Sequence, residues 1–160
     1  MASVYRIASA SADWDEMDLS GAGAKATGGR WNRKGVPMVY TSSSIALAAL
    51  EMIVHLGADA FSLNRYVIEI KIPDDEFAGR LVLKPPPPDA WDSIPESYKS
   101  KDFGSAWVAS ASHLVLDVPS AIVPWERNLL LNPVHPASKA LKATNLGKFV
   151  YDLRLLARSG

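Results

Sequence analysis

The 160-residue chain carries 17 Lys and Arg residues and 17 Asp and Glu residues, so its formal net charge is zero. It lacks the basic excess that is typical of general nucleic-acid and membrane-surface binders. The absence of cysteine excludes disulfides, thiol nucleophiles and thiolate metal sites. No apolar run approaches the length that spans a membrane. We therefore expect one soluble domain over residues 1–160, located in the cytoplasm.

The N-terminal part of the chain predicts a strand, a long connection and a glycine-led turn. Residues 4–8 are expected to form the strand, and residues 9–27, rich in small and acidic side chains, a loop or weak helix. Gly28 and Gly29 then allow a positive φ or a close approach of the backbone to another group. Arg30 follows directly, so this turn holds an arginine at a defined place.

A strand–helix unit comes next. Residues 36–41 predict a short strand, and the serines at 42–44 offer N-caps for a helix over Ile45–Leu56 that Gly57 ends. Glu51 lies in the middle of this helix between apolar neighbours. A carboxylate in such surroundings is costly to bury unless a partner or a ligand uses it.

The middle of the chain predicts two more strands and a proline-rich connection. Tyr66–Ile72 alternates apolar and polar residues, which is the clearest strand pattern in the sequence. A shorter strand is expected over residues 80–83. The four prolines at 85–88 predict a stiff surface connector, because they cannot belong to a helix or a central strand.

The C-terminal half predicts one helix and three strands. The helix is expected over residues 99–112, and the strands over 113–118 (with a possible continuation at 120–123), 128–131 and 148–156. Many short strands with two or three helices predict an α+β fold, a single compact domain of short, mostly antiparallel strands.

Several blocks of sequence resemble the RES domain family, named for an arginine, a glutamate and a serine: GGRWN, VYTSSS, ALAALE, GSAWVAS, LVLDVPSAIVPWERNLLLNPVHP and FVYDLRL. The family comprises the toxins of bacterial RES–Xre toxin–antitoxin modules. The resemblance implies a fold like that of the diphtheria-toxin-type ADP-ribosyltransferases and the degradation of NAD+ at its nicotinamide–ribose bond, by hydrolysis or phosphorolysis. It also implies a hetero-oligomer with an Xre-type antitoxin, through which alone the protein would meet DNA.

The resemblance assigns catalytic roles to four residues. Glu51 would stabilise the ribosyl cation, Arg30 would anchor the dinucleotide, Tyr40 would stack on the nicotinamide, and Ser120 would position the substrate or Glu51. Each residue also has an ordinary structural explanation. Glu51 could face water and pair with His55, Arg30 could be a loop arginine paired with an acid, Tyr40 could belong to the core, and Ser120 could be a turn serine after proline.

Further contacts with NAD+ are expected from Ser43, Ser44 and His135, although an N-cap for the serines and a structural role for the histidine are the plainer explanations. No His or carboxylate spacing suggests a metal site. Trp31, Trp107 and Trp125 fit a core or a pocket wall better than a nucleic-acid platform, because no basic stripe accompanies them.

Three functions remain open from the sequence. The first is a growth-inhibiting toxin that degrades NAD+, with NAD+ as substrate and no separate cofactor. The second is an ADP-ribosyltransferase that uses the same residues and modifies a macromolecule. The third is a non-catalytic module that binds the antitoxin and assists transcriptional autorepression.

Overall fold

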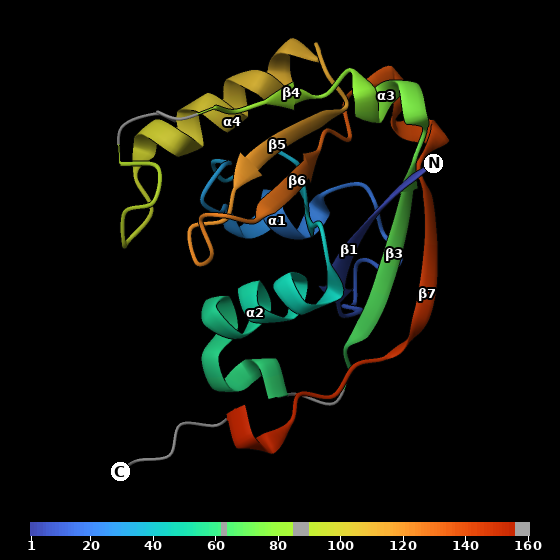
Figure 1. Cartoon of the computed structure of the whole chain (residues 1–160), viewed down its shortest axis with the longest axis vertical. Helices are drawn as coiled ribbons and strands as arrows, with labels where there is room; N and C mark the ends of the chain where they lie inside the picture. The colour runs from blue at the N-terminus through green and yellow to red at the C-terminus, as the bar shows by residue number, and fades with distance from the viewer. Residues whose placement is uncertain (62–63, 85–89, 156–160) are drawn as a thin grey trace.

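A seven-stranded sheet organises the part of the chain described by the computed structural model, residues 1–61, 64–84 and 90–155. The strand order is β4-β5-β6-β2-β1-β3-β7, and every pair is antiparallel except β4–β5 (Figure 1). The strands are β1 (Ala2–Ala8), β2 (Val39–Ser42), β3 (Tyr66–Ile72), β4 (Leu81–Val82), β5 (Val115–Pro119), β6 (Arg127–Leu131) and β7 (Lys142–Lys148).

Four α-helices accompany the sheet in the described residues: α1 (Ala22–Thr27), α2 (Ile45–Leu56), α3 (Asp74–Ala78) and α4 (Tyr98–Ser110). Short 3-10 helices occupy Gly57–Phe61, Pro136–Ala140 and Leu153–Leu155. The predicted α+β fold of mostly antiparallel strands in one domain is therefore confirmed.

Helices α2 and α4 cover the same face of the sheet. Ala48 of α2 packs on Ile7 and Val67, and Trp107 of α4 packs with Leu116 and Leu130. The strand register shows that the parts of the sheet beneath α2 and α4 share one face. Tyr5 of β1 pairs with Ser42 of β2, and Tyr40 points to the same face as Ser42 because it lies two residues earlier in the strand. This face carries the candidate site.

The opposite face forms the larger apolar cluster. Its buried members come from five strands and the residue before β5: Val4, Ala8, Val39, Ile68, Ile70, Ile72, Leu114, Val115, Leu129 and Leu131. The alternation predicted for Tyr66–Ile72 is confirmed here, since Ile68, Ile70 and Ile72 are fully buried on one side of β3. Val67 is buried on the other side, beneath α2.

Helix α4 is fixed by a close approach to the turn that follows α1. A Cβ added to Gly104 would lie 1.8 Å from the carbonyl oxygen of Trp31, so only glycine fits at this point of the helix. The Trp31 indole packs edge-on against Phe103. Trp31 and Trp107 are buried as predicted. Trp125 is 89% exposed, so of the two places predicted for it, core or pocket wall, the core is wrong.

Two strand predictions near the C-terminal end are wrong. Residues 120–123 do not continue β5, because the Ser120 hydroxyl accepts the backbone N–H groups of Ile122 and Val123 and closes a turn. The last strand is β7 at Lys142–Lys148 and not residues 148–156, of which 156 lies outside the described residues. The alternation of apolar and polar residues over 148–156 has another cause. Phe149 and Tyr151 pack edge-to-face beneath α2, and the Tyr151 hydroxyl donates to Ala49 O.

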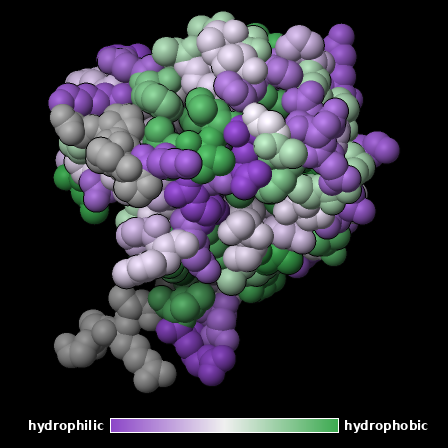
Figure 2. Space-filling view, turned by 45° about the horizontal axis from the view of Figure 1, so that its top comes forward, coloured by the Kyte–Doolittle hydropathy of each residue, from purple (hydrophilic) through white to green (hydrophobic). Residues whose placement is uncertain are grey.

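The other boundaries differ little from expectation. The strand predicted from residue 36 begins at Val39, and the helix predicted over 99–112 is Tyr98–Ser110. The prolines at 85–88 lie outside the described residues. On the face shown in Figure 2, hydrophobic and hydrophilic residues are interspersed. Within the described chain, no helix has both the length and the apolarity needed to cross a membrane.

Candidate active site

Glu51 projects from α2 into a hydrogen-bond network. Its Oε1 atom accepts from Ser120 Oγ at 2.7 Å and from Asn128 Nδ2 at 2.7 Å. The Asn128 amide oxygen in turn accepts from Ser42 Oγ at 2.8 Å. The second carboxylate oxygen, Oε2, accepts no hydrogen bond from any residue that the structure describes. The half-buried carboxylate is thus oriented through one oxygen, while the other can accept a hydrogen bond from a ligand.

The sheet brings these partners together at the ends of three neighbouring strands. Ser42 pairs with Asn128 between β2 and β6, and Asn128 pairs with Val118 between β6 and β5. Paired residues point to the same face, and so does Ser120, two residues beyond Val118. Helix α2 lies over this face, so Glu51 meets side chains that follow it by 69 and 77 residues.

Ser120 is fully buried and donates its hydroxyl proton to Glu51. Because its oxygen also accepts two backbone N–H groups, it is a fixed positioning group and not a free nucleophile. Its predicted role, to position the substrate or Glu51 for catalysis, stays a prediction. The expected alternative for Glu51, a pair with His55 on the helix surface, is not what the structure shows.

Arg30 sits on a tight turn closed by two backbone hydrogen bonds between Gly29 and Asn32. Its Nη1 atom donates to the carbonyl oxygens of Trp91 at 2.8 Å and Ser93 at 3.0 Å. Neutral acceptors therefore hold the guanidinium, and no carboxylate among the described residues forms an ion pair with it. A guanidinium that no described carboxylate pairs with directly suits an anionic ligand.

Tyr40 holds this turn in place. Its hydroxyl donates to Asn32 Oδ1 at 2.6 Å and accepts from the Trp31 backbone N–H at 3.0 Å. A Cβ added to Gly29 would lie 2.7 Å from the same hydroxyl, which explains the second glycine of the motif. Burial raises the pKa of Tyr40 well above its ordinary value of 10.0. The hydroxyl thus positions Arg30's turn; stacking on nicotinamide stays a prediction.

Arg30, Tyr40 and Glu51 belong to the same face of the sheet. Tyr40 and Ser42 alternate along β2, so the side chain that holds the Arg30 turn and the network around Glu51 project from one side of the strand. The two cavities of about 440 Å³ and about 310 Å³ are lined by other residues. The larger is an apolar groove between α2 and residues 149–155.

The three remaining candidates are placed differently. Ser44 caps α2, because its hydroxyl accepts from Leu47 N at 3.1 Å, and Ser43 is exposed beside it. His135 lies beyond the far end of β6 from Asn128, where its Nδ1 atom accepts from Ala137 N. The structure therefore does not bring His135 together with Glu51. Within the described residues, no group of three or more His, Asp or Glu side chains could hold a metal ion.

Sequence reasoning missed Asn128 and Ser42, which complete the network around Glu51, and Asn32, which receives the Tyr40 hydroxyl. Asn128 and Ser42 occupy ordinary positions at strand ends, and nothing in their spacing distinguishes them. Asn32 follows Arg30 within the GGRWN motif and could have been singled out there. Its buried amide also donates to the Ala24 and Val36 carbonyls.

This small α+β domain thus carries one oriented carboxylate, Glu51, and one arginine, Arg30, whose acceptors among the described residues are neutral carbonyl groups. Comparison with known proteins gives its family: residues 3–152 match the RES domain model, and the chain belongs to the RES domain family. The resemblance seen in the sequence is thereby confirmed.

Several curated proteins are similar over most of their length. The "Prs ADP-ribosylating toxin" of Sphingobium sp. (strain YBL2) is 48% identical over 158 residues, 98% of each chain. The "Toxin Res" of Yersinia enterocolitica is 40% identical over 139 residues, 85% of this chain and 89% of that protein. Both of these relatives are named as toxins.

Among solved structures, the crystal structure of the M. tuberculosis MbcT–MbcA toxin–antitoxin complex contains a similar chain. The TM-score is 0.57 and the sequence identity 19%, with 90% of this chain and 83% of that chain covered. At this identity the likeness concerns the fold.

Proposed function

We propose that this protein is a toxin that cleaves the nicotinamide–ribose bond of NAD+. The observation that carries the proposal is the state of Glu51: Ser120 and Asn128 orient its carboxylate through Oε1, and Oε2 is left for a ligand. A fixed negative charge of this kind stabilises a cation that develops beside it. Holding the ribose by a hydroxyl group at Oε2 would place its anomeric carbon close to that charge.

The reaction needs little covalent help from the protein. The C–N bond breaks with its electron pair going to the positively charged nicotinamide, which leaves as a neutral molecule, and the ribose becomes an oxocarbenium ion. An acceptor oxygen then bonds to the anomeric carbon and loses its proton. In this scheme Glu51 stabilises the cation, Arg30 holds the pyrophosphate, and Tyr40 keeps the turn of Arg30 in place.

The first experiment measures nicotinamide release from NAD+ by the purified protein. Glu51→Gln should lower kcat by at least about 100-fold, which corresponds to about 2.7 kcal/mol of transition-state stabilisation. Glu76→Gln on α3, which belongs to the opposite face, is the matched control and should retain wild-type release. A Glu51→Gln protein as active as the wild type would refute the proposal.

A second question is which molecule accepts the ADP-ribose group, and the name of one relative bears on it. Because a protein 48% identical to this chain is named for ADP-ribosylating Prs, transfer of ADP-ribose to a protein, with Prs as the first candidate, is the alternative to water and phosphate. NAD+ labelled in its adenine should be incubated with the toxin and Prs, with and without phosphate. Label on Prs supports transfer, whereas free ADP-ribose or its phosphate ester as sole product supports hydrolysis or phosphorolysis.

We also propose that an Xre-type antitoxin binds and neutralises the protein. The proposal rests on family membership and on the fold shared with the toxin of a solved toxin–antitoxin complex. Co-expression with a candidate antitoxin should give a complex that co-purifies and releases less nicotinamide than the toxin alone. Growth inhibition that persists in Glu51→Gln while the complex still forms would favour the non-catalytic alternative.

A further inference from the structure

A concave site rich in hydrogen-bond donors lies on the other side of the Arg30 turn. The cavity of about 310 Å³ is lined by Thr27, Gly28, Arg33, Lys34, Tyr98 and Lys101. These residues come from the end of α1, the turn after Arg30 and the first part of α4. The lining carries three cationic side chains and a phenol, and no carboxylate.

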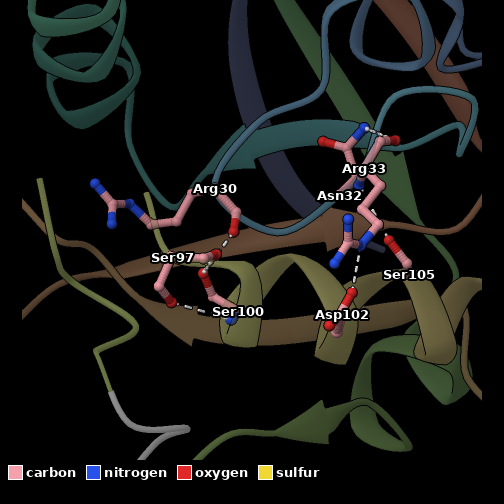
Figure 3. Close-up of polar contacts among 7 residues, drawn as sticks. All are labelled: Arg30, Asn32, Arg33, Ser97, Ser100, Asp102 and Ser105. Atoms are coloured by element: carbon pink, nitrogen blue, oxygen red, sulfur yellow. Dashed lines mark hydrogen bonds and ion pairs between the residues drawn. The ribbon is translucent and has the colours of Figure 1, made fainter. Parts of the chain in front are cut away.

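Arg33 is held in place and still has free donors. Its Nε atom is paired with Asp102 Oδ1, and its backbone N–H donates to Ser105 Oγ at 3.1 Å (Figure 3). Its guanidinium carbon lies 4.8 Å from the centre of the Tyr98 ring. Within the described residues, its Nη1 and Nη2 atoms make no hydrogen bond. A guanidinium anchored through Nε can offer these two atoms to an anion.

This cavity is separate from the proposed active site although both adjoin one turn. In Figure 3 the Arg33 guanidinium lies beside Asp102 on α4, whereas the Arg30 side chain extends to the left, away from both. Arg30 reaches the carbonyl oxygens of Trp91 and Ser93, whereas Arg33 lies over α4 beside Asp102. Ser100 Oγ donates to Arg30 O, so α4 supports the turn at both places.

The charge around the cavity is positive although the whole chain is neutral. Three cations line it, and counting the paired Asp102 leaves a local charge of about +2, against zero for the 160 residues. Lys34 and Lys101 form no ion pair with any described residue. Donors that converge on a small concave volume fit an anion with several oxygens, whereas a protein partner needs a contact area of about 1,000 Å² or more.

We propose that this cavity binds a small phosphate-bearing molecule, a phosphate ester or a diphosphate. Arg33 and the two lysines contact the phosphate oxygens. Tyr98, whose ring is 70% exposed, can contact whatever group the phosphate carries. The binding does not depend on turnover of NAD+, so it can be tested whether or not the proposed reaction is correct.

The test is isothermal titration of inorganic pyrophosphate at low salt, with circular dichroism to verify folding. Wild type should bind pyrophosphate saturably, and Lys34→Ala/Lys101→Ala should weaken binding to this cavity at least tenfold. Lys139→Ala/Lys142→Ala, which removes two exposed lysines elsewhere, is the charge-matched control and should bind as wild type does. Arg30→Ala is a second background, because it removes any pyrophosphate held at the proposed active site, and in it Lys34→Ala/Lys101→Ala should weaken the remaining binding by the same factor.

Three results would overturn the proposal: no saturable binding to the wild type, equal losses in the two lysine variants, or a loss in Arg30→Ala that the Lys34→Ala/Lys101→Ala variant does not show. Binding of an oligoglutamate peptide without binding of pyrophosphate would also overturn it. Titration of ADP identifies the source of the phosphate. Tighter binding of ADP than of pyrophosphate, reversed by Tyr98→Ala, supports a nucleotide, and equal binding supports an inorganic ligand.

Discussion

At the scale of single residues, the two oxygens of Glu51 have different surroundings. Oε1 takes both hydrogen bonds that the protein supplies, and Asn128 is the partner that sequence analysis missed. An amide that donates to a carboxylate and accepts from Ser42 restricts the carboxylate to one orientation. Asn128 is thus a positioning residue that acts through Glu51.

Asn128→Ala should therefore lower kcat for nicotinamide release more than it raises KM. A hydrogen bond to a charged group contributes about 1.5–3 kcal/mol, which corresponds to a loss of about 10- to 100-fold if the oriented carboxylate acts in the transition state. Steady-state kinetics measure the effect, and Asn64→Ala at an exposed position is the control. A kcat within twofold of wild type would show that Asn128 does not position the carboxylate.

Tyr40 gives a prediction about pH. Burial raises its pKa above 10.0 in the folded protein, so the folded state keeps the proton more firmly than the unfolded chain. The stabilisation is fully present below pH 10 and falls above it, by up to about 1.4 kcal/mol per pH unit, since the unfolded chain ionises first. Tyr40→Phe should be less stable at pH 8 because Asn32 and the Trp31 N–H lose their partner, and its stability should decline less above pH 10.

Urea denaturation between pH 8 and pH 11.5 measures both effects. Tyr151, whose pKa burial raises to about 12, should contribute to the same decline, so Tyr40→Phe/Tyr151→Phe should show the flattest profile. An identical slope for the wild type and Tyr40→Phe above pH 10 would contradict the assignment.

At the scale of elements, the sequence predicted helix α2 but not its contacts with the sheet. Its bounds, Ile45–Leu56, and its end at Gly57 are as predicted, because the Ser44 cap and the glycine are local signals. Which side of the helix meets the sheet was not specified by these signals. Ala48 packs on Ile7 and Val67, and this packing sets the direction of Glu51.

Ser44→Ala tests whether this serine serves the helix or the substrate. Loss of the hydrogen bond from Leu47 N should lower the unfolding free energy by about 1 kcal/mol and leave KM for NAD+ unchanged. Ser43→Ala, at the exposed neighbouring position, should leave stability unchanged. A raised KM in Ser43→Ala alone would support the predicted substrate contact at that residue, whereas a raised KM in Ser44→Ala would show that the cap is not its only role.

At the scale of the whole molecule, Asp117 ties distant segments together. Asp117 is 5% exposed, and its carboxylate pairs with Arg80 at 2.9 Å and Arg127 at 2.6 Å. Arg127 also donates to the carbonyl oxygen of Leu83 at 2.9 Å. These contacts join β5, the start of β6 beside Asn128, and the chain on either side of β4.

Asp117→Asn should destabilise the protein by about 2–3 kcal/mol. Removing one partner of a buried pair costs about 3–5 kcal/mol, and the effect is smaller here because water partly reaches both arginines. Chemical denaturation measures the change. Asp102→Asn, which breaks the exposed pair with Arg33, is the control and should leave the unfolding midpoint unchanged. Equal midpoints for Asp117→Asn and the wild type would refute the structural role.

The two erroneous strand predictions show why patterns fail where packing decides. Phe149 and Tyr151 are spaced as they would be on one face of a strand. Their side chains instead pack against α2, and this segment is not a strand of the sheet. Ser120, which follows Pro119, continues no strand because its hydroxyl binds the next turn and Glu51 together. In both places, long-range contacts outweigh the local preference.

Local sequence signals were enough to predict the capped helix that carries Glu51, the glycine turn before Arg30 and the buried strand β3. The motifs were also enough to recognise the RES family. Capping, alternation and glycine geometry act between near neighbours, so they can be recognised without a structure. That Ser120 and Asn128 meet Glu51, and that Arg33 pairs with Asp102 of α4, became visible only in the folded chain. The physical reason is strand register, which sets the side-chain faces and joins residues far apart in the chain.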